Sequence, residues 1–347
     1  MIKIAIVALP YCHGSGVIGI MDFFAAANFC DQPTPSDGPR FDCQIVTVDG
    51  APVTTYSGVS IAPTTEWPDY NPDLIIVGSA MEAVLGDRHI DTSLARSAPI
   101  HDWLRNSHQQ GATLASVCTG SFVLAEAGLL ANQVATTHWR AAPAFRRRFP
   151  EVRLEADELL IDNGQIICAG GATSFVDLCL YLVEKLGSPS LALACSKLLI
   201  LDARRTEQTP YMSFYSSLAH QDDAIAETQR WLETHYNDPL SVDQLAGIAG
   251  IGTRTFKRRF KDATGETPLH YIQQMRIEAA KHQLESTQQQ TSQIIWGVGY
   301  EDTSSFRRLF KRTVGCTMEQ YRRRFSYVTP RLTSHKQQPL ASENHSH

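Results

Sequence analysis

A six-residue pattern occurs twice near the carboxyl end of this chain, at a constant offset of fifty positions and without a gap. The residues of the first copy are Thr253, Phe256, Phe260, Lys261, Gly265 and Tyr271. The second copy repeats the same residue types at Thr303, Phe306, Phe310, Lys311, Gly315 and Tyr321. A self-match at a constant offset indicates two structural modules of one design. Residues 252–325 are therefore expected to fold as a duplicated element.

Each copy predicts an amphipathic helix with a basic outer face. Phe256 and Phe260 are four positions apart, so on a helix they share one face and can enter a core. The opposite face is predicted to be solvated and cationic. Its members are Arg254, Lys257 and Arg258 in the first copy, and Ser304, Arg307 and Arg308 in the second.

A shorter apolar helix is predicted ahead of each basic helix, over 242–246 and 292–296, and glycine-bearing turns at 250–252 and 299–302 separate the members of each pair. This layout is typical of a helix-turn-helix, whose second helix enters the major groove of DNA. The alternative is a solvated charged face on an ordinary helical bundle. The matched basic positions favour DNA binding, with the two motifs on successive major-groove segments.

The sequence over 256–271, Phe-Lys-Arg-Arg-Phe-Lys with its following Gly, Pro and Tyr, and the sequence over 297–322 carry a family resemblance. Together they resemble the two helix-turn-helix motifs of the AraC/XylS family of transcription regulators, over about 222–325. The resemblance implies a sequence-specific DNA-binding regulator. Arginines that reach guanine edges would specify sequence, while Lys261 and Lys311 would hold phosphates.

Two positions depart from the AraC/XylS pattern. Met318 stands where a proline is usual, and Trp296 stands where the first helix of the second motif usually has a small residue. We expect both to be packing positions, so that the departures affect local geometry more than DNA binding.

Charge is distributed unevenly along the chain, although its net value is only −5. Residues 1–210 carry 14 Lys and Arg against 22 Asp and Glu, whereas residues 250–326 carry 14 against 7. A basic block on an acidic body is expected where one end of a protein meets phosphate.

The eight cysteines show neither a CxxC pair nor a metal-ligand spacing, which favours a reducing cytoplasm. The apolar run 2–9 reads as a buried strand rather than a signal peptide, and no segment approaches a membrane span.

The first two hundred residues alternate short apolar runs with helical patterns, which predicts an α/β fold with a doubly wound, mostly parallel, flavodoxin-like sheet. The expected strands are 2–7, 41–48, 74–78, 113–117 and 166–169, and the expected helices are 19–29, 100–110, 121–127, 175–186 and 191–201. The C-terminal domain is expected to be all-α. The predicted division is a sensor or dimerisation domain over 1–205, a linker over 206–221, a DNA-binding domain over 222–326 and a disordered tail over 327–347.

A second candidate site is the turn at Cys118. A strand, then Val117-Cys118-Thr119-Gly120, then a helix is typical of an elbow that exposes a nucleophile at a strand tip. The N-terminus of the following helix would lower the pKa of the Cys118 thiol, and His138 is the best candidate partner. The alternative is that Cys118 is a small buried residue filling a tight turn.

The stretches 115–130, 136–139 and 162–177 resemble the class I glutamine amidotransferase-like fold of the PfpI and isocyanide hydratase type. Taken with the C-terminal region, the chain resembles GlxA-type regulators over about nine tenths of its length. Enzymes of this superfamily carry an acid after the first strand. Aligning that region places Gly16 where the acid would fall, and Asp22 lies further along the helix. The resemblance therefore implies a non-catalytic domain that binds a small effector or pairs two protomers.

Two alternatives to a sensing regulator stay open. One is a cysteine-dependent hydratase or amidase, working through Cys118, with an autoregulatory DNA-binding domain. The other is a scaffold that only dimerises and has no ligand. The expected partners of the sensing regulator are double-stranded operator or promoter DNA, a small effector of the nitrogen-metabolite class, a second copy of the chain, and RNA polymerase. No cofactor, no metal ion and no membrane contact are expected.

Overall fold

The computed structural model describes residues 1–31, 40–80, 84, 89–201, 205–214 and 220–328. Two compact units divide the chain, an N-terminal unit over Met1–Met212 and a C-terminal unit over Ser213–His347. Most of the tail predicted as disordered, from residue 329 on, lies outside the described residues. The functional roles assigned to the predicted domains stay predictions.

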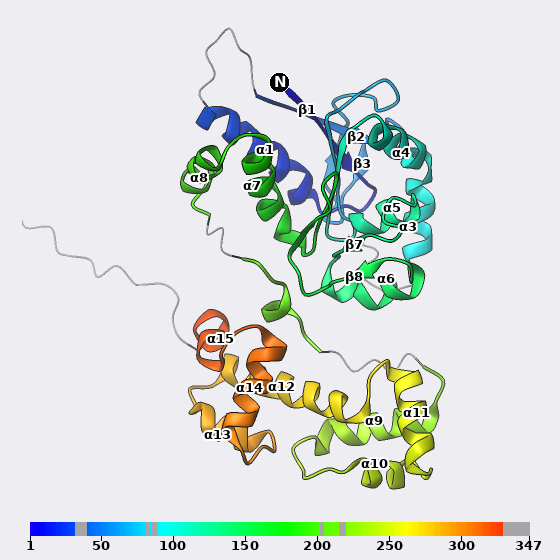
Figure 1. The fold of residues 1–347 in the computed structure, drawn as a ribbon, viewed down its shortest axis with the longest axis vertical. Helices are drawn as coiled ribbons and strands as arrows, with labels where there is room; N and C mark the ends of the chain where they lie inside the picture. The colour runs from blue at the N-terminus through cyan, green and yellow to red at the C-terminus, as the bar shows by residue number, and fades with distance from the viewer. Residues whose placement is uncertain (32–39, 81–83, 85–88, 202–204, 215–219, 329–347) are drawn as a thin grey trace, which may run out of the picture. The chain divides into compact units, whose positions relative to one another are not determined.

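One six-stranded sheet forms the centre of the N-terminal unit (Figure 1). The five strands β2, β1, β5, β6 and β10 lie side by side and run parallel, and only β9 at the edge is antiparallel. Their bounds, in sheet order, are β2 Phe41–Thr47, β1 Ile2–Ala8, β5 Leu74–Val77, β6 Thr113–Val117, β10 Ile166–Ala169 and β9 Leu160–Asp162. Strands β5 and β10 are buried along their whole length, as expected for a sheet that is covered on both faces. The predicted doubly wound, mostly parallel sheet is confirmed.

Helices cover both faces of this sheet (Figure 1). One layer is α1 (Gly14–Asp31), α7 (Phe175–Leu186) and α8 (Pro189–Leu198), and the other is α3 (Ile90–Ser97), α4 (His101–Gln109) and α5 (Gly120–Glu126). The small pairs β3 (Val53–Thr54) with β4 (Ser60–Ile61) and β7 (Val134–Ala135) with β8 (Arg153–Leu154) lie outside the main sheet, and α6 (Ala142–Arg148) precedes β8.

Helix α1 begins five residues earlier than the sequence pattern predicts. The predicted start, Gly19, lies inside the helix, where a Cβ atom would come within 2.7 Å of the Phe175 ring of α7. The glycine there marks a close approach of α7 to α1 rather than a helix boundary.

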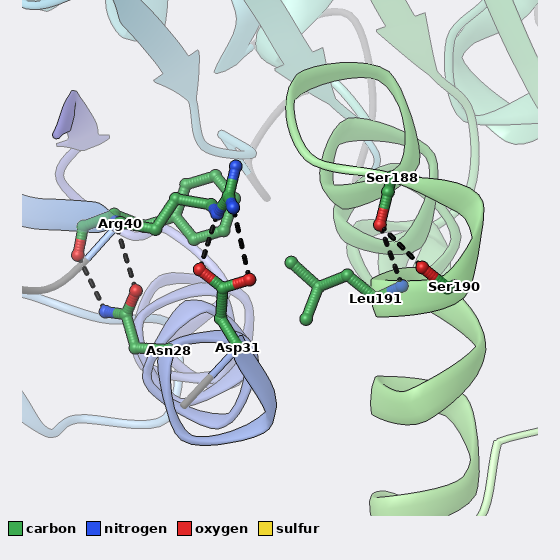
Figure 2. A network of polar contacts seen from close by, with 7 residues as sticks. Asn28, Asp31, Arg40, Ser188, Ser190 and Leu191 are labelled. Carbon is green, nitrogen blue, oxygen red and sulfur yellow. Dashed lines mark hydrogen bonds and ion pairs between the residues drawn. The ribbon is translucent and has the colours of Figure 1, made fainter. Parts of the chain in front are cut away.

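Side-chain hydrogen bonds fix the end of α1 to β2, and Figure 2 shows this network. Asn28 accepts from the backbone N–H of Phe41 at 2.9 Å and donates to its carbonyl at 2.8 Å. Beside it, the Arg40 Nε donates to Asp31 at 2.6 Å. In the same view Ser188 caps α8 by accepting from the backbone N–H of Leu191 at 3.1 Å.

The described part of the C-terminal unit is all-α, and its duplication follows the sequence repeat closely. Its helices are α9 Asp223–His235, α10 Val242–Ile248, α11 Thr253–Thr264, α12 Pro268–Ser286, α13 Thr291–Gly297, α14 Thr303–Val314 and α15 Met318–Phe325. Helices α11 and α14 therefore start and end fifty residues apart. Each is closed by a glycine in the left-handed region, Gly265 at φ 80° and Gly315 at φ 79°. The predicted pair of helix-turn-helix motifs is confirmed.

Each motif has its own apolar core. Phe256 and Phe260 are fully buried and Tyr271 packs against Phe260, with ring centroids 5.2 Å apart. The second core repeats this arrangement with Phe306, Phe310 and Tyr321. The helix faces predicted from the four-residue spacing are therefore the buried ones.

The two departures from the family pattern have different outcomes. Met318 is 1% exposed and packs in the second core, so its prediction as a packing residue is confirmed. The same prediction for Trp296 is wrong, because its side chain is 59% exposed. The buried face of α13 consists of Ile294 and Ile295, and the next position turns out of the core.

Arg276 of α12 joins the two motifs. Its guanidinium donates to the carbonyls of Tyr236 at 2.6 Å and Asp238 at 2.7 Å, in the turn before the first motif. It also donates to the carbonyl of Gly299 at 3.1 Å, in the turn of the second motif. Three charge-assisted hydrogen bonds from one rigid group therefore fix one motif relative to the other.

Gly299 brings the same two segments into direct contact. Its φ of 85° lies in the left-handed region, and a Cβ atom there would stand 2.2 Å from the carbonyl oxygen of Asn237. Both the backbone conformation and the available space therefore require glycine at this position.

We predict that Arg276→Met lowers the free energy of unfolding of the C-terminal unit by about 2–4 kcal/mol, because methionine keeps the apolar packing and leaves three carbonyls without their donor. Denaturant unfolding monitored by far-ultraviolet circular dichroism would measure it. Arg230→Met, at an exposed position of α9, is the matched control and should change little. Equal stabilities of the two variants would contradict the joining role of Arg276.

Candidate nucleic-acid interface and cysteine elbow

The basic face predicted for α11 is solvent-exposed. All four predicted residues, Arg254, Lys257, Arg258 and Lys261, are exposed, whereas the two phenylalanines between them are buried. Arg258 lies 3.4 Å from Asp262, one turn away, in an ion pair whose members are both more than half exposed. Such an exposed pair contributes little to stability, so Arg258 can exchange Asp262 for a phosphate.

The second motif presents the matching face on α14. Ser304, Arg307, Arg308 and Lys311 are all exposed. Arg307 donates to the hydroxyl of Thr291 at 3.0 Å, which ties α14 to the start of α13. In the part of the chain that the structure describes, no hydrogen bond or ion pair engages the side chains of Arg254, Lys257, Lys261, Arg308 or Lys311.

Not every cation of the repeat faces solvent in this way. Arg259, next to Arg258, donates to both carboxylate oxygens of Asp222 at 2.8 and 2.6 Å, and this ion pair lowers the pKa of Asp222. A further exposed cation, Arg312, lies on the last turn of α14 and was not among the predicted residues. The prediction was based on basic residues that occur in both copies, and the counterpart of Arg312 in the first copy is Asp262.

The turn at Cys118 has the geometry of an elbow. Cys118 has φ 57°, a left-handed conformation that is strained for a residue with a side chain, and its N–H donates to the carbonyl of Ala169 at 2.8 Å. A Cβ atom at Gly120 would stand 2.4 Å from the carbonyl oxygen of Val77, so β5 and α5 meet closely there.

The thiol of Cys118 is nevertheless fully buried. Burial raises its pKa to about 12, although hydrogen bonds from Thr119 act in the opposite direction. The expected lowering of this pKa by the start of α5 is therefore wrong, because loss of solvation outweighs the helix terminus.

His138 is not hydrogen-bonded to Cys118 in the described structure. Its Nδ1 accepts from the backbone N–H of Arg140 at 3.2 Å, and its ring stacks on Trp139. Burial, followed by the charge of Arg140, lowers the pKa of His138 to about 4. The residue that does contact this turn is Thr137, whose hydroxyl donates to the carbonyl of Cys118 at 3.2 Å.

The position aligned with the family's acid offers space but no carboxylate. Gly16 is buried in α1, and a Cβ atom there would lie 3.9 Å from His13 and 4.0 Å from Phe175. Asp22 is exposed further along α1, as expected. Cavities of about 360 and 490 Å³ in the N-terminal unit are lined by neither Cys118 nor His138.

Gln208 is a further residue of interest that could not be predicted from sequence, because a single glutamine in a charged stretch carries no local signal. It lies in the segment Arg205–Met212, called the strap below, which is an ordered part of the N-terminal unit although most of it falls in the predicted linker. Gln208 is only 2% exposed, and its carboxamide is hydrogen-bonded beside the segment that carries Thr137 and Trp139.

The described residues form neither a metal site nor a membrane-spanning helix. Among the described residues no group of three or more His, Cys, Asp or Glu side chains is placed to hold a metal ion. Within the same residues, every helix is too short or too polar to cross a membrane.

Known proteins resemble this chain over both units. A helix-turn-helix domain model matches residues 245–324, and the DJ-1/PfpI family model matches residues 3–185, more than half of the chain. The HTH-type transcriptional regulator CdhR of Pseudomonas aeruginosa is 28% identical over 83% of this chain and 84% of its own length. The regulator GlxA of Rhizobium meliloti is 27% identical over 67% of this chain and 72% of its own.

Part of the chain also resembles an enzyme. The isonitrile hydratase of Pseudomonas putida is 31% identical over 149 residues, which cover 43% of this chain and 60% of that protein. The relatives that extend across both units are named transcriptional regulators. The chain belongs to the DJ-1/PfpI family, and a helix-turn-helix domain of the AraC type follows its DJ-1/PfpI domain.

Proposed function

We propose that this protein is a cytoplasmic, sequence-specific DNA-binding transcription regulator that reads a duplex through α11 and α14. The observation that carries the proposal is the matched pair of exposed cationic faces on two motifs that Arg276 fixes to each other. Five side chains of these faces have no partner among the described residues. Unpaired cations on a rigid surface suit a polyanion, because binding releases the counterions that DNA condenses.

The residues on each face divide by their chemistry. Arg254, Arg258, Arg307 and Arg308 carry forked guanidinium groups that match the two acceptors of guanine in the major groove. Lys257, Lys261 and Lys311 are point charges suited to phosphates, and Ser304 can donate to a base or a phosphate. RNA polymerase is the further macromolecular partner that regulation of transcription calls for.

We propose that the N-terminal unit binds a small effector of the nitrogen-metabolite class or pairs two protomers, without catalysis. Three observations support this. The thiol of Cys118 is buried with a raised pKa, His138 makes no hydrogen bond to it, and Gly16 supplies no carboxylate. A nucleophilic cysteine needs an accessible thiolate and a group that shuttles protons.

The second candidate function is a cysteine-dependent hydratase or amidase with an autoregulatory DNA-binding domain. The strained conformation of Cys118 and the likeness of part of the chain to isonitrile hydratase favour it. Turnover of an isonitrile or amide that is lost in Cys118→Ser would support this candidate.

Arg258→Ala should weaken binding to a specific site by about 1–3 kcal/mol, if the guanidinium reads a base, and should leave affinity for random duplex nearly unchanged. Fluorescence anisotropy with an operator selected from a random duplex library would measure both affinities. Arg230→Ala removes the same charge from an exposed position of α9 and is the matched control. Equal losses on specific and random DNA would show that Arg258 contacts only phosphate.

Binding to DNA should weaken steeply with salt. Seven cations line the two faces, and if most of them meet phosphates, affinity should fall about 10³-fold between roughly 50 and 200 mM monovalent salt. A titration of the dissociation constant against salt concentration tests this expectation. A flat response would contradict phosphate contacts through these faces.

Cys118 should resist alkylation. A pKa of about 12 leaves only about one thiolate in 10⁴ at pH 8, so iodoacetamide should label Cys118 about 10³-fold more slowly in the folded protein than in urea. Mass spectrometry of the Cys118 peptide measures both rates. Labelling of the folded protein at the rate of the unfolded chain would contradict the buried thiol and favour the enzymatic candidate.

A further inference from the structure

The carboxamide of Gln208 lies in a cradle of four oxygen atoms. The distances from Gln208 Nε2 are 2.9 Å to the carbonyl of Thr137, 3.0 Å to that of Ala156, 3.1 Å to that of Glu158, and 3.2 Å to the hydroxyl of Thr136. The carboxamide oxygen accepts from the backbone N–H of Trp139 at 3.4 Å. Because Gln208 is 2% exposed, these atoms are shielded from water.

The cradle has more acceptors than its occupant has hydrogens. A carboxamide nitrogen carries two hydrogens, whereas an alkylammonium carries three and a positive charge. Three carbonyl dipoles and a hydroxyl around one point therefore suit a nitrogen donor in general, and they suit an ammonium group at least as well as an amide. A carboxylate would be rejected, because its oxygen lone pairs would face the carbonyl oxygens.

Gly170 shows that the neighbouring backbone is shaped around this side chain. A Cβ atom at Gly170 would stand 2.0 Å from the Nε2 and 2.4 Å from the Cδ of Gln208, whereas one at Gly171 would stand 3.7 Å from the nearest carboxamide atom. The backbone of Gly170 does not lie in the left-handed region, so its conformation alone does not require glycine. All three atoms nearest to this Cβ position belong to Gln208, so the absence of a side chain at position 170 makes room for this glutamine.

The strap is also held by bonds at Gln208 and before it. The carbonyl of Thr206 accepts from the N–H of Leu159 at 3.1 Å, and the N–H of Gln208 donates to the carbonyl of Asp157 at 2.7 Å. Arg205 forms an ion pair with Asp177 at its start.

The strap also leads directly into the C-terminal unit. Phe214, six residues after Gln208, packs there against Tyr271 with ring centroids 4.9 Å apart. Because an extended chain spans at most about 3.3–3.6 Å per residue, release of the strap would change the length of the tether to the DNA-binding motifs.

We propose that the cradle is an effector site for a small molecule with a nitrogen-donor head group, an alkylammonium or a primary carboxamide, and that Gln208 is the internal occupant that this molecule replaces. Replacement frees the strap and lengthens the tether of the C-terminal unit. The regulatory consequence rests on the proposed function, whereas the ligand chemistry of the cradle does not.

Hydrogen exchange of the full-length protein tests whether Gln208 holds the strap. Gly170→Ala should expel the carboxamide and raise the exchange rates of the Leu159 and Gln208 amides at least about tenfold, while the matched variant Gly171→Ala should leave them unchanged. Equal protection in the two variants would overturn the proposal. Gln208→Ala should reproduce the effect of Gly170→Ala, and it decides the question if Gly170→Ala does not fold.

Three probes test the ligand chemistry: ethylammonium chloride, propionamide and sodium propionate. The first two should raise the melting temperature of Gln208→Ala by filling the vacated cradle, and should increase exchange of the strap in the wild type, whereas propionate should do neither. A response to ethylammonium alone or to propionamide alone identifies the head group. If neither nitrogen probe exceeds propionate, the effector site is refuted.

DNA binding of the same samples separates the two levels of inference. If the cradle takes a nitrogen probe but the wild type binds no DNA at low salt, the proposed function fails and the site survives. If DNA binding is intact and the probes have no effect, the site fails and the regulator survives.

Discussion

The three hydrogen bonds of Arg276 are the contact that fixes the two helix-turn-helix motifs relative to each other. Two separate helix-turn-helix motifs can read one duplex together only if their recognition helices keep a fixed spacing and angle. Helix α12 contributes Tyr271 and Ile272 to the first core and Ile277, Ala280 and Leu284 to the second, so it connects the two motifs. From α12, Arg276 adds hydrogen bonds to carbonyls on both sides, and Gly299 lets the backbones approach. A pre-formed spacing also avoids the entropy of ordering two motifs on binding.

The N-terminal unit combines the backbone of a nucleophile elbow with a buried thiol. The strained φ of Cys118 and the tight packing at Gly120 preserve the turn. Burial has the opposite effect on reactivity, because an apolar environment favours the neutral thiol and the neutral imidazole over their charged forms. Gly16 supplies no carboxylate beside this turn, and the nearest side chains around a Cβ atom there are His13 and Phe175.

In the effector mechanism that we propose, the strap is the physical link between the cradle and the C-terminal unit. Gln208 occupies a polar cradle in the DJ-1/PfpI domain, and the same short stretch of chain continues into the core of the first motif. A ligand can shift such an equilibrium only by the difference between its affinities for the closed and open strap. An internal occupant lowers the apparent affinity of any effector by the fraction of time that it fills the cradle.

Local patterns along the chain determined most of the architecture and the exposed basic faces of α11 and α14. The fifty-residue repeat and the four-residue spacing of Phe256 and Phe260 specify two helices with one buried and one basic face, because helix periodicity is a local property. The apolar runs likewise specify a parallel sheet, and the Cys118 turn specifies an elbow. These predictions needed no knowledge of distant contacts.

Tertiary structure alone decided which side chains are available and which are engaged. Arg258 and Arg259 are adjacent and chemically alike, but only Arg259 is bonded to Asp222, 37 residues away. Trp296 turned outward because its neighbours fill the core, and burial rather than the helix terminus set the pKa of Cys118. Gln208 became a structural centre through oxygens 50 to 72 residues away. Solvation and long-range hydrogen bonding depend on what the folded chain brings together, and residue spacing does not encode them.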